Sequence, residues 1–404
     1  MTATFIILKC VCIFIVAAKR TPFGTMGGVF SNKSATDLSV VAAKSALQSA
    51  KLNPDKIDSV VFGHVLAVSS ADGGFLARHV ALKSGIPLEK PAFSVNRLCG
   101  SGFQSIVNGA QDILTGQSKI VLTGGTDNMS QIPFVVRNVR FGTTLGQKYE
   151  FEDALWLGLF DTYCNLPMGI TAEKLGAQYN LNRQEVDEFA LRSQQLWKAA
   201  NDAGRFKEEL APVTITVKKQ NVVVSTDEHP RPQTTSQSLA ALPPVFQKDG
   251  LVTAGSASGV CDGAGAIILA SEEAVKTEQL TPLARLIGYS IVGVEPSIMG
   301  IGPAPAIKQL LKVTDKNLND VELVEINEAF GAQTLACARE LDLDINKLNV
   351  DGGAIALGHP LAASGSRITA HLIHELRRRK SGKLGIGSAC IGGGQGIAVM
   401  VEAL

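Results

Sequence analysis

The sequence has almost no net charge and few charged side chains for its length. In 404 residues, 38 lysines and arginines face 37 aspartates and glutamates, and charged residues make up only 19% of the chain. This balance gives no overall field that would attract nucleic acid or an acidic lipid surface, so we expect neither as a partner. The 45% of hydrophobic residues predicts a well-packed globular protein of roughly two or three domains, or of one duplicated unit.

The cysteines lack the spacing of a disulfide framework or a metal site. There are seven, an odd number, and no two form a Cys-x-x-Cys pair. The pattern argues against a zinc ribbon and favours separate free thiols in a reducing compartment, and we expect no bound metal. The common glycine-rich phosphate motifs, G-x-x-x-x-G-K-[ST] and a G-x-G-x-x-G that opens a helix, are also absent.

The apolar stretch near the N-terminus is too short to cross a bilayer. It runs from Phe5 to Ala18 and is interrupted by Lys9, whereas a membrane span needs about 20 apolar residues. A secretory signal has a basic residue before its apolar run, and this stretch has none. Residues 1–12 also lack the Arg- and Ser-rich character of a transit peptide. We predict a buried strand from Ile13 to Ala18 after an atypical extension, and no stable membrane insertion. A cleaved or disordered targeting segment is the alternative.

Short apolar runs alternate with helical patterns, which indicates an α/β protein with parallel strands joined by crossover helices. Asp58–Val65 and Lys119–Gly124 predict strands, and Lys33–Ala50 and Gly102–Leu114 predict helices.

The second part of the chain repeats the plan of the first. Ser94–Gly125 reads as strand, Cys-Gly-Ser-Gly turn, helix and strand, and Val350–Gly394 follows the same plan with the same spacing between its Ser-Gly pair and the next strand. The repeat predicts two halves, residues 1–272 and 281–404. Residues from about 130 to 250 read as an insertion into the first half, with a helix that begins after Asn182.

Cys99 is the strongest candidate for a reactive side chain. It follows an apolar strand, precedes a predicted helix and has Gly100 and Gly102 beside it. A helix N-terminus stabilises a thiolate, and the glycines let a substrate approach the backbone. For a cysteine without such neighbours, a buried core position would be the ordinary interpretation. A free thiol is mostly protonated at neutral pH, so a base is needed as well.

His359 is the best placed of the six histidines to be that base. It lies in a Gly-His-Pro segment at the second half's counterpart of the Cys99 turn, so a pseudo-twofold relation would bring the two together. His371 and His374 are three residues apart on one predicted helix and lack a third ligand, which favours a solvated helix face over a metal site.

Two further candidates follow predicted strands. Cys390 comes after the last apolar strand of the second half and precedes three glycines, whose N–H groups can point at an anion. Asn327 follows the predicted strand Val321–Ile326. Its amide can be a simple cap or can hold a catalytic water.

These motifs together resemble those of the thiolase family. They occur in the family's order across nearly the whole chain, as Asn96–Gly102, Asn327–Phe330, Gly358–Pro360 and Cys390–Gly396. The surrounding sequence is most similar to members that cleave 3-ketoacyl-CoA in mitochondrial fatty-acid β-oxidation. The resemblance implies two βαβαβαββ halves in a five-layered αβαβα sandwich with an inserted loop domain, and a homotetramer built as a dimer of dimers.

The resemblance also implies a role for each motif residue. Cys99 would be the nucleophile and His359 its base. Cys390 would protonate the departing acetyl-CoA carbanion and then deprotonate CoA. His359 and a water held by Asn327 would form one oxyanion hole, and the N–H groups of Cys99 and Gly392 the other.

Coenzyme A is the implied second substrate, and no bound cofactor is expected. By family resemblance CoA would contact Arg231, Thr234 and Ser258. The implied reaction is thiolytic cleavage of a 3-ketoacyl-CoA to acetyl-CoA and a shortened acyl-CoA, with the reverse Claisen condensation possible. The implied location is the mitochondrial matrix, with cytosol or peroxisome as alternatives.

The sequence departs from the family pattern at two places near these motifs. Ala362 stands after His-Pro-Leu where the family has glycine; a backbone with φ > 0 there would strain the loop that holds His359. His64 replaces the usual asparagine. Three alternatives stay open: an acetoacetyl-CoA-specific thiolase, a catalytically weak thiolase-like protein that binds CoA or lipid, and a ketoacyl synthase, which shares the fold but pairs one cysteine with two histidines.

Overall fold

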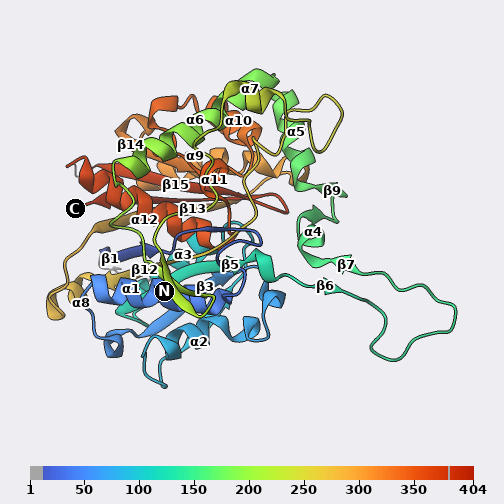
Figure 1. The fold of residues 1–404 in the computed structure, drawn as a ribbon. Coiled ribbons are helices and arrows are strands. Elements are labelled where there is room, and N and C mark those ends of the chain that lie inside the picture. The colour runs from blue at the N-terminus through green and yellow to red at the C-terminus, as the bar shows by residue number, and fades with distance from the viewer. Residues whose placement is uncertain (1–11, 381–382) are drawn as a thin grey trace, which may run out of the picture.

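The structure is a computed structural model that describes residues 12–380 and 383–404 (Figure 1). Most of the extension predicted for residues 1–12 therefore lies outside the described residues. No helix in the described ranges is both long and apolar enough to cross a membrane.

The first half of the chain alternates strands and helices and ends in two consecutive sheet strands. Its elements are β1 (Ile13–Arg20), α1 (Ala35–Ser49), β3 (Ser59–His64), α2 (Leu76–Lys83), β4 (Ala92–Val95), α3 (Ser101–Leu114), β5 (Ile120–Asn128) and β12 (Cys261–Ser271). The predicted strands and helices of this half are all present. Ser34 begins α1 through a capping box with Asp37, because each side chain accepts from the other residue's main-chain N–H.

The second half repeats this order with one reduction. Its elements are β13 (Ala284–Gly293), α9 (Pro303–Thr314), β14 (Val321–Ile326), α10 (Gly331–Leu341), α11 (Ala354–Leu357), α12 (Ala363–Arg378), β15 (Leu384–Ile391) and β16 (Gln395–Ala403). Where the first half has β4, the second has only an isolated parallel bridge between Val324 and Leu348. A short helix, α8 (Glu272–Thr277), lies between β12 and β13, where the two halves join.

The strands form one continuous path that β1 joins in the middle. The order is β14-β15-β16-β13-β1-β12-β5-β3-β4. β1 pairs with β12 along its length, and only its first residues, Ile13 to Ile15, pair with β13. The path therefore consists of two half-sheets that share one strand.

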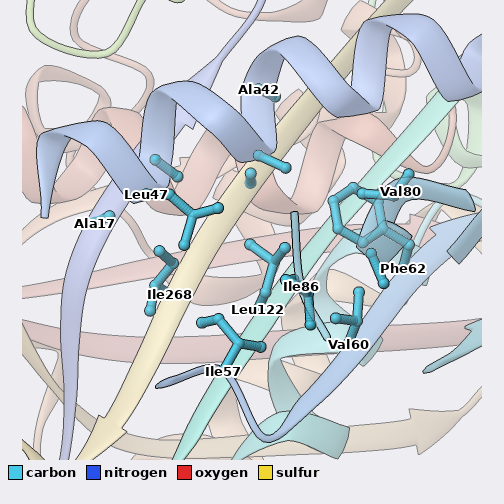
Figure 2. Close-up of a cluster of buried hydrophobic side chains, with 14 of the residues drawn as sticks. Ala17, Ala42, Leu47, Ile57, Val60, Phe62, Val80, Ile86, Leu122 and Ile268 are labelled. Atoms are coloured by element: carbon cyan, nitrogen blue, oxygen red, sulfur yellow. The ribbon is translucent and has the colours of Figure 1, made fainter. Parts of the chain in front are cut away.

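Helices cover both faces of each half-sheet, which gives five layers. Figure 2 shows one outer layer, where Ala42 and Leu47 of α1 pack over Phe62, Leu122 and Ile268 of the first half-sheet. A second apolar cluster joins α3 and α12 to strands of both half-sheets, and a third packs α9 and α10 on the other half-sheet. The fold is therefore the αβαβα sandwich that the family resemblance implied, built from the two halves that the repeat predicted.

The central helices approach each other closely through glycines. A Cβ on Gly365 of α12 would lie 2.2 Å from the main-chain nitrogen of Phe103, and one on Gly102 of α3 would lie 2.4 Å from the carbonyl oxygen of Ala362. Side chains at these positions would push the helices apart. The two Ser-Gly pairs of the sequence repeat thus mark the contact between α3 and α12.

The segment between β5 and β12 contacts both halves. It contains β6 (Phe134–Val135), β7 (Glu152–Asp153), α4 (Ala154–Gly158), β8 (Phe160–Asp161), β9 (Leu166–Pro167), α5 (Met168–Gln178), α6 (Arg183–Asp202), β10 (Val213–Val217), β11 (Gln220–Val224) and α7 (Ser236–Ala240). α5 and α6 pack on α10 of the second half, α6 also contacts α11, and β10 packs on the core of the first half. The chain between β6 and β7 projects from the body as a long arm (Figure 1).

Candidate active site

Cys99 follows a strained turn that ends just before α3. Leu98 has φ +44°, in the left-handed region that a branched side chain rarely adopts. The Ser101 hydroxyl accepts from Arg97 N at 2.8 Å and donates to Leu98 O at 2.7 Å, while Asn96 Oδ1 accepts from Leu98 N at 2.9 Å. The turn holds Cys99 with its side chain only partly buried. The sequence pattern had given no sign of the strain at Leu98.

A cavity of about 240 Å³ brings most of the predicted site residues together. Cys99, His359, Cys390, Gly392 and Ser258 all line it. The remaining wall is largely apolar and is drawn from both halves and from the insertion, including Leu98, Met129, Trp156, Leu159, Met168, Phe246, Met299, Phe330 and Leu361. The convergence of Cys99 with His359 and Cys390, which lie on the other half, agrees with the predicted pseudo-twofold arrangement.

His359 is held as a neutral imidazole whose Nε2 atom carries no proton. Asn327 Nδ2 donates to Nε2 at 3.3 Å, so the ring proton lies on Nδ1, which is 2.6 Å from Ser364 Oγ. The His359 N–H donates to Gly259 O at 2.9 Å. Burial, with a smaller effect of the Arg367 charge, lowers the pKa of His359 to about 3. Ser364 takes the orienting position that a carboxylate holds in many catalytic triads.

The two thiols are protonated in this environment. Burial raises the pKa of Cys99 to about 11, although a hydrogen bond from the Gly392 N–H to the sulfur opposes the rise. Desolvation outweighs the nearby N–H donors at the start of α3, so Cys99 needs a base, as expected from the sequence. Burial also raises the pKa of Cys390, and the negative charge that Cys99 can carry adds to that shift.

Asn327 is fixed by the main chain and by the residue that follows it. Its N–H donates to Ser388 O at 2.9 Å, and its Oδ1 is buried without a hydrogen-bond partner in the described part of the chain.

Glu328 is buried too and accepts from Ser193 Oγ, Asn349 Nδ2 and the Ile355 N–H. Glu328 thereby anchors the segment that leads to His359, a role that sequence reasoning missed.

Asp127 is a second buried carboxylate that sequence reasoning missed. At the end of β5, its Oδ1 accepts from the N–H groups of Val65 and Leu66, and its Oδ2 accepts from Ala362 N at 2.7 Å. It therefore ties a loop of the first half to the His359 loop of the second. His64 lies beside it, with Nε2 3.8 Å from Asp127 Oδ1.

The strain that could have arisen at Ala362 is not present. This residue has φ −74° and ψ −22°, an ordinary helical conformation. Its methyl group is fully buried and needs no left-handed backbone. The replacement of the family's glycine therefore leaves the His359 loop undistorted.

The residues that the resemblance assigns to CoA lie partly outside the cavity. Ser258 lines it, whereas Arg231 and Thr234 are on the loop between β11 and α7 and are not among its lining residues. Gln194 Oε1 accepts from the Arg231 N–H, and Thr234 Oγ1 donates to Arg231 O. The Arg231 guanidinium makes no ion pair with any residue of the described ranges, which leaves it available to an anionic ligand.

The solvated helix face predicted for His371 and His374 is wrong. His371 is 4% exposed and contacts Glu209 and Asp351, and His374 is half-buried against Ala18 O. Burial opposes a charge on His371, but attraction to Glu209 and hydrogen bonds to both carboxylates outweigh it and raise its pKa to about 10. Within residues 12–380 and 383–404, no group of three or more His, Cys, Asp or Glu side chains is placed to hold a metal ion.

Comparisons with known proteins give the same picture. The chain is 60% identical to the human protein named 3-ketoacyl-CoA thiolase, mitochondrial, over 96% of this chain and 98% of that protein. It is 45% identical to a probable acetyl-CoA acyltransferase of Staphylococcus aureus, with the same coverage of both chains. The crystal structure of human mitochondrial 3-ketoacyl-CoA thiolase in complex with CoA matches it with a TM-score of 0.95 at 60% identity, covering 98% of each chain.

Two family models cover almost all of the described chain. The thiolase N-terminal domain matches residues 13–273, and the thiolase C-terminal domain matches residues 280–403. The duplicated α/β halves, the shared cavity and these matches agree, and the chain belongs to the thiolase family.

Proposed function

We propose that this protein is a 3-ketoacyl-CoA thiolase, an acyltransferase that cleaves a 3-ketoacyl-CoA with CoA. The observation that carries the proposal is the meeting of Cys99, His359 and Cys390 in one apolar cavity, with the Gly392 N–H directed at the Cys99 sulfur. An apolar wall suits an acyl chain, and one nucleophile, one base and one further acid suit carbon–carbon bond cleavage.

In the first half-reaction, His359 Nε2 takes the Cys99 proton and the sulfur attacks the keto carbon of the substrate. The N–H groups of Cys99 and Gly392 stabilise the oxyanion of the adduct. The Cα–Cβ bond then breaks, its electron pair passes to the acetyl-CoA fragment, and Cys390 gives this carbanion a proton. His359 and a water on Asn327 Oδ1 stabilise the enolate oxygen. The products are acetyl-CoA and an acyl thioester on Cys99.

In the second half-reaction, the Cys390 thiolate takes the thiol proton of CoA. The CoA sulfur attacks the Cys99 thioester, and collapse of the adduct releases the shortened acyl-CoA. The proton held by His359 returns to Cys99. Arg231, Thr234 and Ser258 would hold CoA; the exposed Arg231 guanidinium, which has no ion pair among the described residues, suits a phosphate.

We also propose the assembly and location of this enzyme. Exposed apolar side chains on the arm, including Phe141, Leu145 and Phe151, and an exposed edge at β4 suit contacts between copies. They support a homotetramer formed by two dimers. Mitochondrial relatives at about 60% identity support the mitochondrial matrix as its location.

Product analysis over a series of 3-ketoacyl-CoA chain lengths tests the proposed reaction. Acetyl-CoA and an acyl-CoA two carbons shorter should form in equal amounts, and only when CoA is present. If only acetoacetyl-CoA is cleaved, the protein is instead an acetoacetyl-CoA-specific thiolase. CoA binding without any product would identify a catalytically silent thiolase-like protein.

A further inference from the structure

A second cavity, of about 700 Å³, shares no lining residue with the catalytic one. It lies where β1, the end of α12 and the segment before β13 meet, and Val16 and Leu283 form part of its apolar wall. Its volume falls within the range of small-molecule sites. The proposed thiolase mechanism uses none of its residues.

The cavity carries more positive than negative charge. Lys19, Arg377, Arg378 and Lys380 line it, and Glu208 is the single carboxylate side chain among its lining residues. Lys19 Nζ donates to the Glu208 carbonyl oxygen, and Arg377 Nε donates at 3.1 Å to the terminal main-chain oxygen of Leu404, the last residue of the sequence. In the part of the chain that the structure describes, Lys19 and Lys380 have no carboxylate side chain at ion-pair distance.

Carboxylates close to the cavity are already bound to other cations. Glu209 pairs with Arg20 and His371, and Glu375 pairs with Arg378. Within the described ranges, Arg378 pairs with Glu375 and Arg377 contacts the terminal oxygen of Leu404, so Lys19 and Lys380 are the lining cations left without an anionic partner at ion-pair distance. The remaining positive charge is left for a ligand.

Partial burial disfavours the charged forms of Lys19 and Arg378, and nearby carboxylates do not fully offset this effect. It lowers the pKa of Lys19, against the attraction of Glu208 and Glu209. It also lowers the pKa of Arg378, although Asp351 and Glu209 oppose the shift. Cations partly withdrawn from water in this way are stabilised by an anion that enters the cavity.

We propose that this cavity binds an organic diphosphate, with its phosphate groups on Lys19, Arg377, Arg378 and Lys380. Guanidinium groups bind phosphate oxygens through two donors, and lysines add point charges. The cavity is much larger than one phosphate, and the apolar wall at Val16 and Leu283 suits the organic part. The site is separate from the place where CoA is proposed to bind.

Calorimetric titration of the whole protein with pyrophosphate and with ADP tests this site. Arg377 and Lys380 are exposed, so the double variant R377Q/K380Q keeps the fold and removes two phosphate donors. We expect its affinity for both probes to fall by at least ~10-fold, since each lost charged hydrogen bond costs about that factor. The matched variant K312Q/K316Q, which changes two exposed lysines of another surface, should bind as the wild type does.

A third variant, R231Q, shows where the probes bind. The proposed cavity predicts unchanged pyrophosphate affinity in R231Q. No binding to the wild type, equal binding to R377Q/K380Q, or loss of binding in R231Q alone would each overturn the proposal. Because catalysis does not enter these measurements, they leave the proposed thiolase activity untouched.

Discussion

At the residue scale, Cys99 and His359 line one cavity as uncharged groups in the free protein. The pKa of Cys99 is raised to about 11 and that of His359 is lowered to about 3, in both cases first by burial. A thiolate–imidazolium pair is therefore not the resting state. Proton transfer from Cys99 to His359 becomes favourable when the substrate oxyanion forms next to N–H donors that are already in position. The site therefore stabilises the transition state more than the free nucleophile.

This protonation state predicts the pH dependence of Cys99 alkylation. The rate with iodoacetamide should continue to rise from pH 7 to pH 10, because the thiolate fraction grows throughout this range. Peptide mass mapping separates Cys99 from the partly exposed Cys12 and Cys164. A plateau already reached below pH 7 would show a preformed ion pair and contradict this assignment.

Asp127 predicts a kinetic effect from a residue that does not touch substrate. Asp127→Asn puts an amide where a carboxylate accepts three N–H groups, one of them from the His359 loop. Loss of a hydrogen bond to a charged group costs about 1.5–3 kcal/mol, so kcat should fall roughly 10- to 100-fold. The KM for CoA should be unchanged. The exposed Asp315→Asn is the control, and a wild-type kcat in Asp127→Asn would remove this role.

The sequence predicted the residues that converge in the cavity better than the residues that hold them. Cys99, His359 and Cys390 stand beside glycines in short motifs, so the local pattern marks them. Asp127 and Glu328 act on segments that are distant along the chain, and nothing near them in the sequence identifies their partners. His371 was misassigned for the same reason, because Glu209 reaches it from the inserted segment.

At the element scale, α3 and α12 bring the two halves of the site together. Each begins in a Ser-Gly pair, and glycine lets the helices pack closely at the ends that face Cys99 and His359. The repeat spacing therefore predicted this pair of helices and their relation. It did not predict that the counterpart of β4 is reduced to a single bridge between Val324 and Leu348. The sequence around Leu348 has the pattern of a short strand, and the pattern does not show how many residues pair.

The close helix contact predicts a steric effect at Gly365. Gly365→Ala puts a methyl group 2.2 Å from the Phe103 nitrogen, and overpacking of this kind costs about 1–3 kcal/mol. We expect a lower unfolding midpoint in thermal denaturation and a lower kcat. Gly74→Ala is the matched control, since a Cβ there meets nothing within 4 Å; equal stability of the two variants would contradict the packing argument.

At the scale of the whole molecule, a buried charge network joins the insertion to both halves. Arg20 of β1 pairs with Glu209 and Asp227 of the insertion, and His371 of α12 also pairs with Glu209. These side chains are almost fully buried, so loss of one partner leaves an uncompensated charge. The network fixes the base of the loop that carries Arg231.

His371 gives this network a defined pH dependence. Its folded-state pKa, about 10, lies above its ordinary value of 6.5, so its stabilising contribution is complete below about pH 6.5. The contribution falls by about 1.4 kcal/mol per pH unit as the pH rises toward 10. His371→Gln should destabilise by about 5 kcal/mol near pH 6. Denaturant unfolding should show the gap to wild type closing by pH 10; a gap independent of pH would contradict a charged His371.

The most direct test of the proposed thiolase mechanism is the intact mass of Cys390→Ala after incubation with acetyl-CoA. We predict one acetyl group, mapped to Cys99 and absent in Cys99→Ala, together with thiolysis turnover about 1,000-fold below wild type, because the acid for the carbanion is missing. Wild-type turnover in Cys390→Ala, or acetylation that persists in Cys99→Ala, would contradict the division of roles between the two thiols.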